Sequence, residues 1–362
     1  MLRVAIVGGG LAGVSSLLHL SLSDEVEIDL YDAKEGIGSL YKSTGGISEA
    51  FSTPWLKYIK PATDTFIDRV QIELAGRKIV FEAREGHLGR VVDHTKLERI
   101  MFSEALKNSS NIRVHVKSYI HEPLKLLEDH DFLIGADGVF SRVAEATVGK
   151  IPLSDVYKCL EYWIEHHTTN DLYLFFKEYC PKGYIWVFPS SFGIKIGVGI
   201  PATYRLDIKE IIERFLSEHP EFDGKILRKI VGCVPTAKPL DEVVYNSRIA
   251  LIGDAGRMVN PATGAGIHLA LESGKAVAES IVMTNNLESF EKYYKKRILP
   301  YLKVWYKVKK MLFKLSREEL GMVAEAIGSL IIMPPTNPNI GISKLLRLLV
   351  RHPLLAWKIK SA

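Results

Sequence analysis

Cysteine is scarce in this chain, and its few cysteines are far apart. Among 362 residues there are only three, Cys159, Cys180 and Cys233, with no CxxC pair and no metal-type spacing. A sparse and odd-numbered set argues against a disulfide-stapled secreted fold and fits a reducing cytoplasm. We therefore expect a cytoplasmic protein with no metal site.

Long apolar runs are also missing. A membrane-spanning helix needs roughly 18 uncharged apolar residues, and the best candidate, 322–333, is shorter and contains Glu325. No signal peptide is expected, because Met1 is followed almost at once by a short apolar run and glycines. The content of 47% hydrophobic and 25% charged residues is that of an ordinary globular protein, long enough for two domains.

The N-terminal segment has the pattern of a strand, a turn and a helix. Residues 3–7 predict a buried strand, 11–20 a helix and 26–31 a second strand. The segment GGGLAG lies between the first strand and the helix, where a GxGxxG turn binds a dinucleotide. A glycine-rich turn that binds nothing is the alternative, and the register of strand, helix and a later acid favours the nucleotide.

Each glycine of the GxGxxG motif has a physical role in this turn. Gly8 permits the tight turn, Gly10 lets the backbone approach a pyrophosphate, and Gly13 lets the helix pack on the strand. The helix N-terminus offers free N–H groups to the phosphates, and the acid that ends the second strand can accept ribose hydroxyls. The residues expected to bind the dinucleotide here are Gly8, Gly10, Leu11, Ala12, Gly13 and Asp32.

Strand and helix patterns continue along the chain. Residues 70–74 and 78–81 alternate around Gly76 and predict a hairpin, 95–106 a helix, and 112–116 and 132–134 strands. From 156 to 200, short alternating runs of aromatic and β-branched residues predict an antiparallel sheet. A helix is predicted at 208–216, a buried strand at 249–252, and a long helix that ends at about Met283.

Two later segments repeat the theme of a buried strand that ends in an acid. The first, FLIGADG at 132–138, is a weak signal because Asp-Gly is also a common turn. The second, ALIGDAG at 250–256, continues through the PATGAG loop (residues 261–266) into a helix. Its acid can bond a ribitol-type hydroxyl, and the helix start aims positive charge at a flat ring. The residues expected at the cofactor are Asp137, Gly253, Asp254, Pro261, Gly264, Ala265, Gly266 and Ile267.

The three motifs in this order resemble the flavoprotein superfamily that includes the aromatic hydroxylases and the geranylgeranyl reductases. The resemblance extends from the N-terminus to about Met283 and implies FAD as the cofactor. It implies an α/β fold with a discontinuous Rossmann-like FAD-binding domain, an antiparallel β-sheet substrate domain over the flavin ring, and a C-terminal helical segment. We expect the first domain at 1–47, 86–150 and 240–285, the second at 48–85 and 151–239, and a helical basic region at 286–362.

The segment PKGYIWVFP at 181–189 indicates the branch of the superfamily, since it resembles the PxxYxWxFP signature of geranylgeranyl reductases. Tyr184, Trp186 and Phe188 would share one face of a strand, and such a wall suits an apolar chain. An ordinary aromatic core stripe is the alternative. Tyr184 is also a conceivable proton donor for a reduction, although water or the flavin itself would serve as well.

Two further segments are similar to the family and depart from it. The KSTGG loop (residues 42–46) resembles the KxCGGG-type loop near the flavin, but Thr44 stands where many members have cysteine, and Gly45 and Gly46 still allow close approach to the ring. In VVDHTKLE, His94 stands where the family usually has an FAD-binding arginine. Either Arg90, four residues earlier, compensates for the missing arginine, or His94 itself binds the cofactor; the alternative is that either side chain is a solvated cap.

The C-terminal fifth of the chain is strongly basic. From 291 to 362 it has 15 Lys/Arg against 4 Asp/Glu, whereas the whole chain has a net charge of +5. A long helix is predicted from 288 to 315, with lysines between apolar residues, and a similar basic stretch follows from 344 to 360. Basic amphipathic helices with Trp favour an anionic membrane surface; a packed helical subdomain with solvated lysines is the alternative. Nucleic acid is not expected, because no recognition motif accompanies the charge.

The sequence therefore predicts an FAD-dependent reductase of isoprenoid double bonds on a lipid or lipid precursor, peripheral at the membrane surface. No second dinucleotide motif is visible, so electrons would come from NAD(P)H bound transiently or from a ferredoxin-like carrier. Two alternatives stay open: a flavin-dependent monooxygenase, and a membrane-associated flavin electron carrier or inactive paralogue. Fold does not decide between them.

Overall fold

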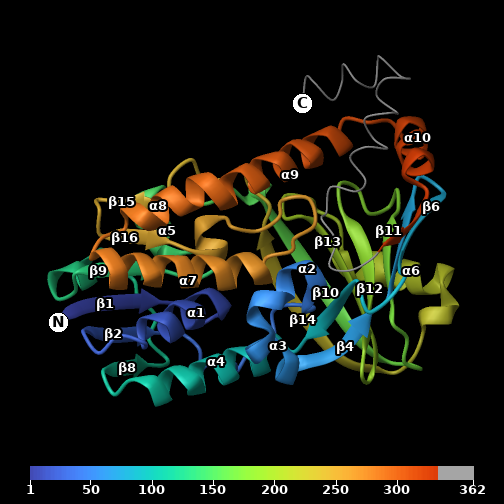
Figure 1. Cartoon of the computed structure of the whole chain (residues 1–362). Helices are drawn as coiled ribbons and strands as arrows, with labels where there is room; N and C mark the ends of the chain where they lie inside the picture. Colours follow the sequence, from blue (N-terminus) through green and yellow to red (C-terminus); the bar gives the residue numbers. More distant parts are fainter. Residues whose placement is uncertain (333–362) are drawn as a thin grey trace.

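A parallel sheet forms one half of the computed structural model, which describes residues 1–332 (Figure 1). Its strand order is β15-β16-β9-β1-β2-β8, and only β15 runs antiparallel to its neighbour. The strands are β1 (Leu2–Val7), β2 (Val26–Tyr31), β8 (Ile112–His115), β9 (Phe132–Gly135), β15 (Val244–Tyr245) and β16 (Ile249–Leu251). The strands predicted at 3–7, 26–31, 112–116, 132–134 and 249–252 are confirmed.

Three helices pack together on one face of this sheet and form the largest core with it. They are α1 (Leu11–Leu20), α4 (His94–Asn108) and α7 (Ile267–Thr284). Asp93 caps α4 by accepting the backbone N–H groups of Thr95 and Lys96. The helices predicted at 11–20, 95–106 and up to about Met283 are confirmed, and the sheet's other face is covered by α5 (Arg142–Thr147) and a 3₁₀ turn.

A mixed sheet of eight strands forms the other half of the molecule, in the order β14-β10-β13-β12-β11-β5-β6-β17. The first five strands are antiparallel, as the alternating pattern predicts, but β5 joins β11 and β17 joins β6 in parallel. The strands are β14 (Ile226–Pro235), β10 (Val156–Glu165), β13 (Gly193–Pro201), β12 (Tyr184–Ser190), β11 (Asp171–Phe176), β5 (Arg69–Leu74), β6 (Arg77–Ala83) and β17 (Ser329–Ile332).

The predicted hairpin around Gly76 is confirmed as β5–β6. Ala75 and Gly76 both have positive φ, of 52° and 77°, as a two-residue hairpin turn of type I′ requires. On the other side of this sheet α6 (Ile208–Glu218) covers a core of alternate residues from β10, β12 and β13. One face of the central strands is therefore buried under α6, and the opposite face turns toward the parallel-sheet half.

A small third sheet joins the two halves. It consists of β3 (Gly46–Ser48), β7 (Gly89–Val92) and β4 (Thr63–Ile67), with α2 (Glu49–Ser52), a 3₁₀ turn at 53–55 and α3 (Leu56–Ala62) between β3 and β4. The short strands β3 and β4 have no clear alternation in the sequence. This sheet straddles the predicted domain limits near residues 47 and 86.

The helices after α7 cross the molecule. α8 (Glu288–Tyr293), a π-helical turn at 294–298 and α9 (Leu299–Leu312) follow one another where one helix was predicted, and α10 (Arg317–Ile327) ends beside β6 (Figure 1). The basic stretch predicted from 344 to 360 lies outside the described residues. Among those that are described, no helix has the length and apolar character needed to cross a bilayer.

The packing of α7 on α1 leads to a stability prediction. A Cβ on Gly274 of α7 would lie 2.4 Å from the backbone oxygen of Ala12, so Gly274→Ala should lower the free energy of unfolding by about 1–3 kcal/mol through overpacking. Gly321 of α10 is the matched helical control, because its Cβ would meet only Ala75 at 4.0 Å. Gly321→Ala should not lower stability, since alanine favours helices by about 1 kcal/mol. Urea unfolding compares the two, and equal effects would contradict the packing argument.

Candidate dinucleotide and substrate site

The first turn of the dinucleotide motif is crowded to the point where only glycine fits. Gly8 has a φ of 107°, and a Cβ on Gly13 would lie 1.8 Å from the carbonyl oxygen of Gly8. Gly10, at the N-cap of α1, faces open space, because its Cβ would meet nothing closer than Glu98 at 3.9 Å. No side chain caps α1, so the N–H groups of its first turn are available to an anion.

Asp32 ends β2 beside this turn and is buried. One carboxylate oxygen accepts the backbone N–H of Gly9 at 2.6 Å, and the other accepts that of Lys34 at 2.7 Å. The Lys34 ammonium lies 3.3 Å from the same carboxylate. These bonds hold the Asp32 carboxylate against the glycine turn, with lone pairs left for ribose hydroxyls.

Asp254 lies in a 3₁₀ turn at Gly253–Gly256, directly after β16. Its carboxylate accepts no hydrogen bond from any residue within 1–332, and burial raises its pKa to about 6 while the charge of Lys42 opposes that rise. Asp254 is half-buried, and a carboxylate with no protein donor has its lone pairs free to accept the hydroxyl of a ligand. The carboxylate therefore fits the ribityl contact that the sequence predicts.

The PATGAG loop follows and leads into α7. Asn260 shapes it, because its side-chain oxygen accepts the N–H groups of Ala262 and Thr263 at 3.0 and 3.1 Å. Gly266 is the N-cap of α7 and offers no side-chain cap, so the positive end of this helix is open beside the loop. Pro261, Gly264 and Ala265 belong to this loop and Ile267 is the first residue of α7, and the approach of a flat ring to them stays a prediction.

The KSTGG loop is fixed from behind by the small sheet and α4. The backbone N–H of Lys42 donates to Nε2 of His94 at 3.1 Å, and burial lowers the pKa of His94 to about 4, so its ring is neutral and able to accept. A Cβ on Gly45 would lie 2.1 Å from the carbonyl oxygen of Val92. His94 thus holds the loop in this structure, and it is not a solvated cap.

Two other predicted cofactor residues are engaged with protein partners. The guanidinium of Arg90 forms a bidentate pair with Glu49, at 2.6 and 3.0 Å. The Asp137 carboxylate accepts the Ser141 hydroxyl and the backbone N–H of Arg142, which caps α5. Both arrangements are those of structural contacts.

The three aromatic residues of β12 share one face, as predicted, and they face both loops. The Phe188 ring packs on Gly46, whose added Cβ would lie 2.5 Å from it. The Tyr184 hydroxyl donates to the carbonyl of Thr263 in the PATGAG loop, and the Tyr184 and Trp186 rings are 5.8 Å apart. We call Tyr184, Trp186 and Phe188 the aromatic wall. The intervening Ile185 and Val187 point into the core under α6.

Two charged residues beside the aromatic wall were missed from the sequence. Glu161 of β10 and Lys195 of β13 are 5% and 4% exposed, and both lie on the face that turns toward the loops. The available signal was a single charge, Lys195, in the otherwise apolar β13, whereas β10 also has Lys158 and Glu165 and so gave no such signal for Glu161. Buried charges need partners, and the partners of these two come from the wall and the KSTGG loop.

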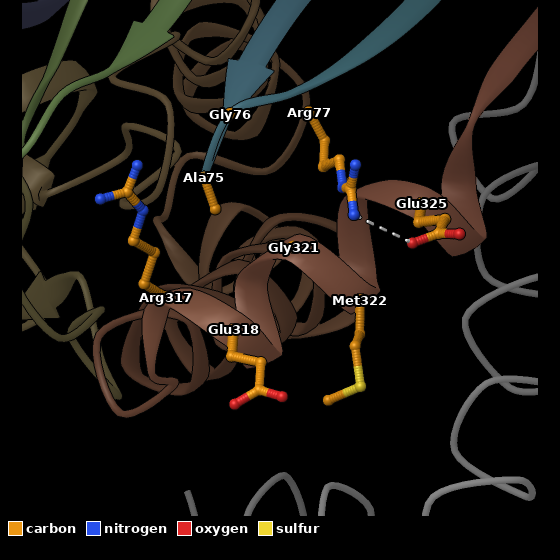
Figure 2. A pocket seen from close by; sticks show the side chains of 8 residues that line it. All are labelled: Ala75, Gly76, Arg77, Arg317, Glu318, Gly321, Met322 and Glu325. Atoms are coloured by element: carbon orange, nitrogen blue, oxygen red, sulfur yellow. Dashed lines mark ion pairs between the residues drawn. The ribbon is translucent and has the colours of Figure 1, made fainter.

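An open hollow lies far from these loops, between the tip of the β5–β6 hairpin and α10 (Figure 2). It is bridged by a pair between Arg77 and Glu325 at 3.8 Å, and Arg317 at its rim pairs with Glu178. The other lining residues are Ala75, Gly76, Glu318, Gly321 and Met322. None of the predicted site residues lines it, so it is separate from the candidate site.

The open N-termini of α1 and α7, the carboxylates of Asp32 and Asp254, and the closely packed glycines suit an elongated dinucleotide with a flat ring. The glycine turn, Asp32 and the KSTGG loop come from the first 46 residues, whereas Asp254 and the PATGAG loop come from a stretch that begins at residue 254. The glycine turn, Asp32 and Asp254 directly follow β1, β2 and β16, at one edge of the parallel sheet. Such an edge, beyond the carboxyl ends of parallel strands, is where α/β sheets bind nucleotides.

Comparison with known proteins agrees with these motifs. A family model described as the geranylgeranyl reductase catalytic domain matches residues 155–234. The digeranylgeranylglycerophospholipid reductase of Methanococcus aeolicus is 26% identical over 90% of both chains. A geranylgeranyl bacteriochlorophyll reductase-like protein of Thermoplasma acidophilum has a TM-score of 0.83 at 20% identity, covering 100% of this chain and 99% of that one. HpxO of Klebsiella pneumoniae, solved with FAD and uric acid, has a TM-score of 0.66 at 16% identity, covering 96% and 97%.

The different surroundings of the two motif acids lead to a binding prediction. Asp254→Ala should weaken FAD binding by about 10- to 100-fold, because a hydrogen bond to a charged group contributes about 1.5–3 kcal/mol. Asp137→Ala should keep its FAD affinity and lose stability instead, since its carboxylate caps α5. Titration calorimetry of the flavin-free proteins with FAD, together with thermal melts, separates the effects. Equal loss of FAD in both variants would show that Asp137 also binds the cofactor.

Proposed function

We propose that this chain, a member of the geranylgeranyl reductase family of FAD-dependent oxidoreductases, reduces isoprenoid carbon–carbon double bonds on a lipid or lipid precursor. The observation that carries the proposal is the aromatic wall, which lies against both the KSTGG loop and the PATGAG loop. The names of the archaeal relatives support a glycerophospholipid that carries geranylgeranyl chains as the substrate class. An apolar chain laid along the wall would have its double bonds beside the flavin ring.

The chain would hold FAD with the residues already described. The glycine turn and the first turn of α1 would bind the pyrophosphate, Asp32 the adenosine ribose, and Asp254 the ribityl hydroxyls. The open N-terminus of α7 would face the ring. When bound and reduced, FAD supplies the hydride that the alkene accepts. The protein's part is to orient the chain and exclude water.

Tyr184 acts in this proposal as a positioning residue and not as the proton donor. Its hydroxyl proton is donated to the Thr263 carbonyl, and burial raises the pKa of that hydroxyl above its ordinary value. A phenol held in this way is a poor acid. Its bond instead ties the aromatic wall to the PATGAG loop, and the proton for the second alkene carbon comes from water or from the flavin.

The helical stretch from α8 through the π-helical turn to α9 supports a second element of the proposal, attachment to an anionic membrane surface. Over its first part, residues 288–303, Tyr294, Ile298 and Leu302 are buried against the body, and Lys292, Lys295 and Lys303 pair with acidic residues. This part of the stretch is therefore ordinary packing.

The next two turns of α9 differ. Lys307 and Lys310 are exposed and have no salt-bridge partner among residues 1–332, and Val304 and Phe313 expose apolar surface near them. Lys309, between them, is half-buried and donates to the Thr236 carbonyl at 2.7 Å, and this burial lowers its pKa to about 8. Exposed lysines beside exposed apolar groups are the composition of an interfacial helix.

The electron donor in this proposal is external, either NAD(P)H or a ferredoxin-like carrier.

Substitution of the wall tests the substrate proposal. Trp186→Ala should raise the KM for digeranylgeranylglycerophospholipid by about 10-fold or more, because a buried aromatic contact of 2–3 kcal/mol is lost. FAD content should stay normal. Mass spectrometry of the lipid, after incubation with dithionite-reduced enzyme, counts the hydrogens gained. A normal KM in the variant, or oxygen consumption driven by a phenol in place of lipid reduction, would contradict the proposal.

Charge reversal on α9 tests the membrane proposal. Lys307→Glu/Lys310→Glu should weaken binding to vesicles that contain phosphatidylserine by about 30-fold at low salt, because each lysine contributes about 1 kcal/mol at an anionic leaflet. Lys125→Glu/Lys209→Glu is the matched control, since it changes the net charge equally through exposed lysines elsewhere. Vesicle sedimentation measures the binding. The same loss in both double variants would mean that no local site exists on α9.

A further inference from the structure

A glycine in β13 lets a side chain of β12 reach β10 across the mixed sheet. Trp186 of β12 and Glu161 of β10 are both register partners of Gly197, which lies on the strand between them. Because Gly197 has no side chain, the indole of Trp186 lies over it: a Cβ there would be 2.3 Å from the ring. The indole N–H then donates to a carboxylate oxygen of Glu161 at 3.0 Å.

Glu161 also binds two other groups. The indole N–H of Trp163 donates to its second oxygen at 2.9 Å, and the Thr44 hydroxyl donates to the oxygen that Trp186 uses. Three neutral donors thus surround one buried carboxylate, which supplies the hydrogen bonds that a charge needs away from water. Two of the donors belong to functional parts of the site, the aromatic wall and the KSTGG loop.

Lys195 completes the hold on Thr44. Its ammonium, on β13, donates to the backbone carbonyl of Thr44 at 3.1 Å and lies 5.0 Å from the Trp163 ring. Burial lowers the pKa of Lys195, and the charges of Glu161, Asp64 and Asp93 oppose that shift. Thr44 is therefore held by two hydrogen bonds: its hydroxyl donates to Glu161, and its carbonyl accepts from Lys195. This is the position where the family's loop usually has a cysteine, whose thiol is a much weaker hydrogen-bond donor than a hydroxyl.

We propose that Glu161 is a positioning residue that sets Trp186 and Thr44 in one fixed arrangement, so that a single carboxylate aligns the substrate wall with the flavin loop. The inference deepens the proposed function and rests on it. It assigns to Thr44 a structural reason that a cysteine would not satisfy, and it makes the angle of the Trp186 ring depend on a bond to β10, which lies beyond β13 in the sheet.

The test uses the FAD-loaded full chain and two independent measurements. Visible circular dichroism of the oxidised flavin reports the loop without turnover, and steady-state reduction of digeranylgeranylglycerophospholipid with dithionite gives KM and kcat. Thr44→Val should change the flavin dichroism and lower kcat with little effect on KM. Trp186→Phe, which keeps a ring and loses the N–H, should raise KM and leave the dichroism unchanged. Glu161→Gln should do both, with about a 10-fold or larger fall in kcat/KM.

Two controls make the result specific. Thr44→Ser keeps the hydroxyl and should retain the wild-type dichroism, whereas Glu165→Gln, at the exposed end of the same strand, should leave both measurements unchanged. Wild-type values in Glu161→Gln would overturn the inference. So would a Thr44→Val variant with unchanged dichroism, a result that stands even if Glu161→Gln fails to fold. If the wild type does not reduce the lipid, the proposed function fails, and the dichroism of these variants still decides the role of Glu161 toward the loop.

Discussion

The site depends on one close contact, the crossing of the first turn of α1 over the end of β1. Gly13 lies so near to the Gly8 carbonyl that no side chain fits between them. This contact brings the start of α1 to the edge of the parallel sheet, next to the end of β9, and α7 packs on α1 with a similarly close glycine at 274. The PATGAG loop at the start of α7 is therefore placed relative to the glycine turn by backbone contact, which leaves little freedom for the turn and the loop to move apart.

The same device recurs in the mixed sheet with a different purpose. Gly197 and Gly46 are places where a missing side chain makes room for an aromatic ring of the wall. In the parallel-sheet half, glycine lets two backbones approach closely, whereas around the mixed sheet it leaves room for an aromatic ring. The buried Glu161 and Lys195 then connect the wall to the KSTGG loop, so the two halves meet through polar contacts as well as through apolar packing.

Much of this arrangement could be predicted from residues alone. The glycine spacing, the strand-ending acids and the alternating strands of the sheet domain each follow from local geometry, and the structure has them where expected. β14 was missed because Arg228 and Lys229 interrupt its alternation and half of its residues are exposed, as on an edge strand. The parallel pairing of β5 with β11 joins segments about 100 residues apart, and no local pattern encodes it.

The site shows the same division. The sequence placed the loops and the wall, because each is a contiguous motif. Both Asp137 and Asp254 were predicted to bind the cofactor, because each follows a buried strand in a similar motif. In the structure the Asp254 carboxylate has no protein donor among the described residues, whereas Asp137 caps the helix that begins five residues later. The sequence did not reveal the bond between Glu161 and Trp186, which needs the register of three strands. Contacts across strands are fixed by tertiary structure, and single-sequence patterns do not contain them.

The central claim is that a prenyl chain on the aromatic wall receives hydride from the flavin held by the two loops. The most direct measurement is anaerobic stopped-flow absorbance of the reduced, FAD-loaded protein mixed with digeranylgeranylglycerophospholipid. The account predicts that the flavin reoxidises with lipid alone, in proportion to the double bonds lost. Flavin that stays reduced until oxygen is admitted would contradict it.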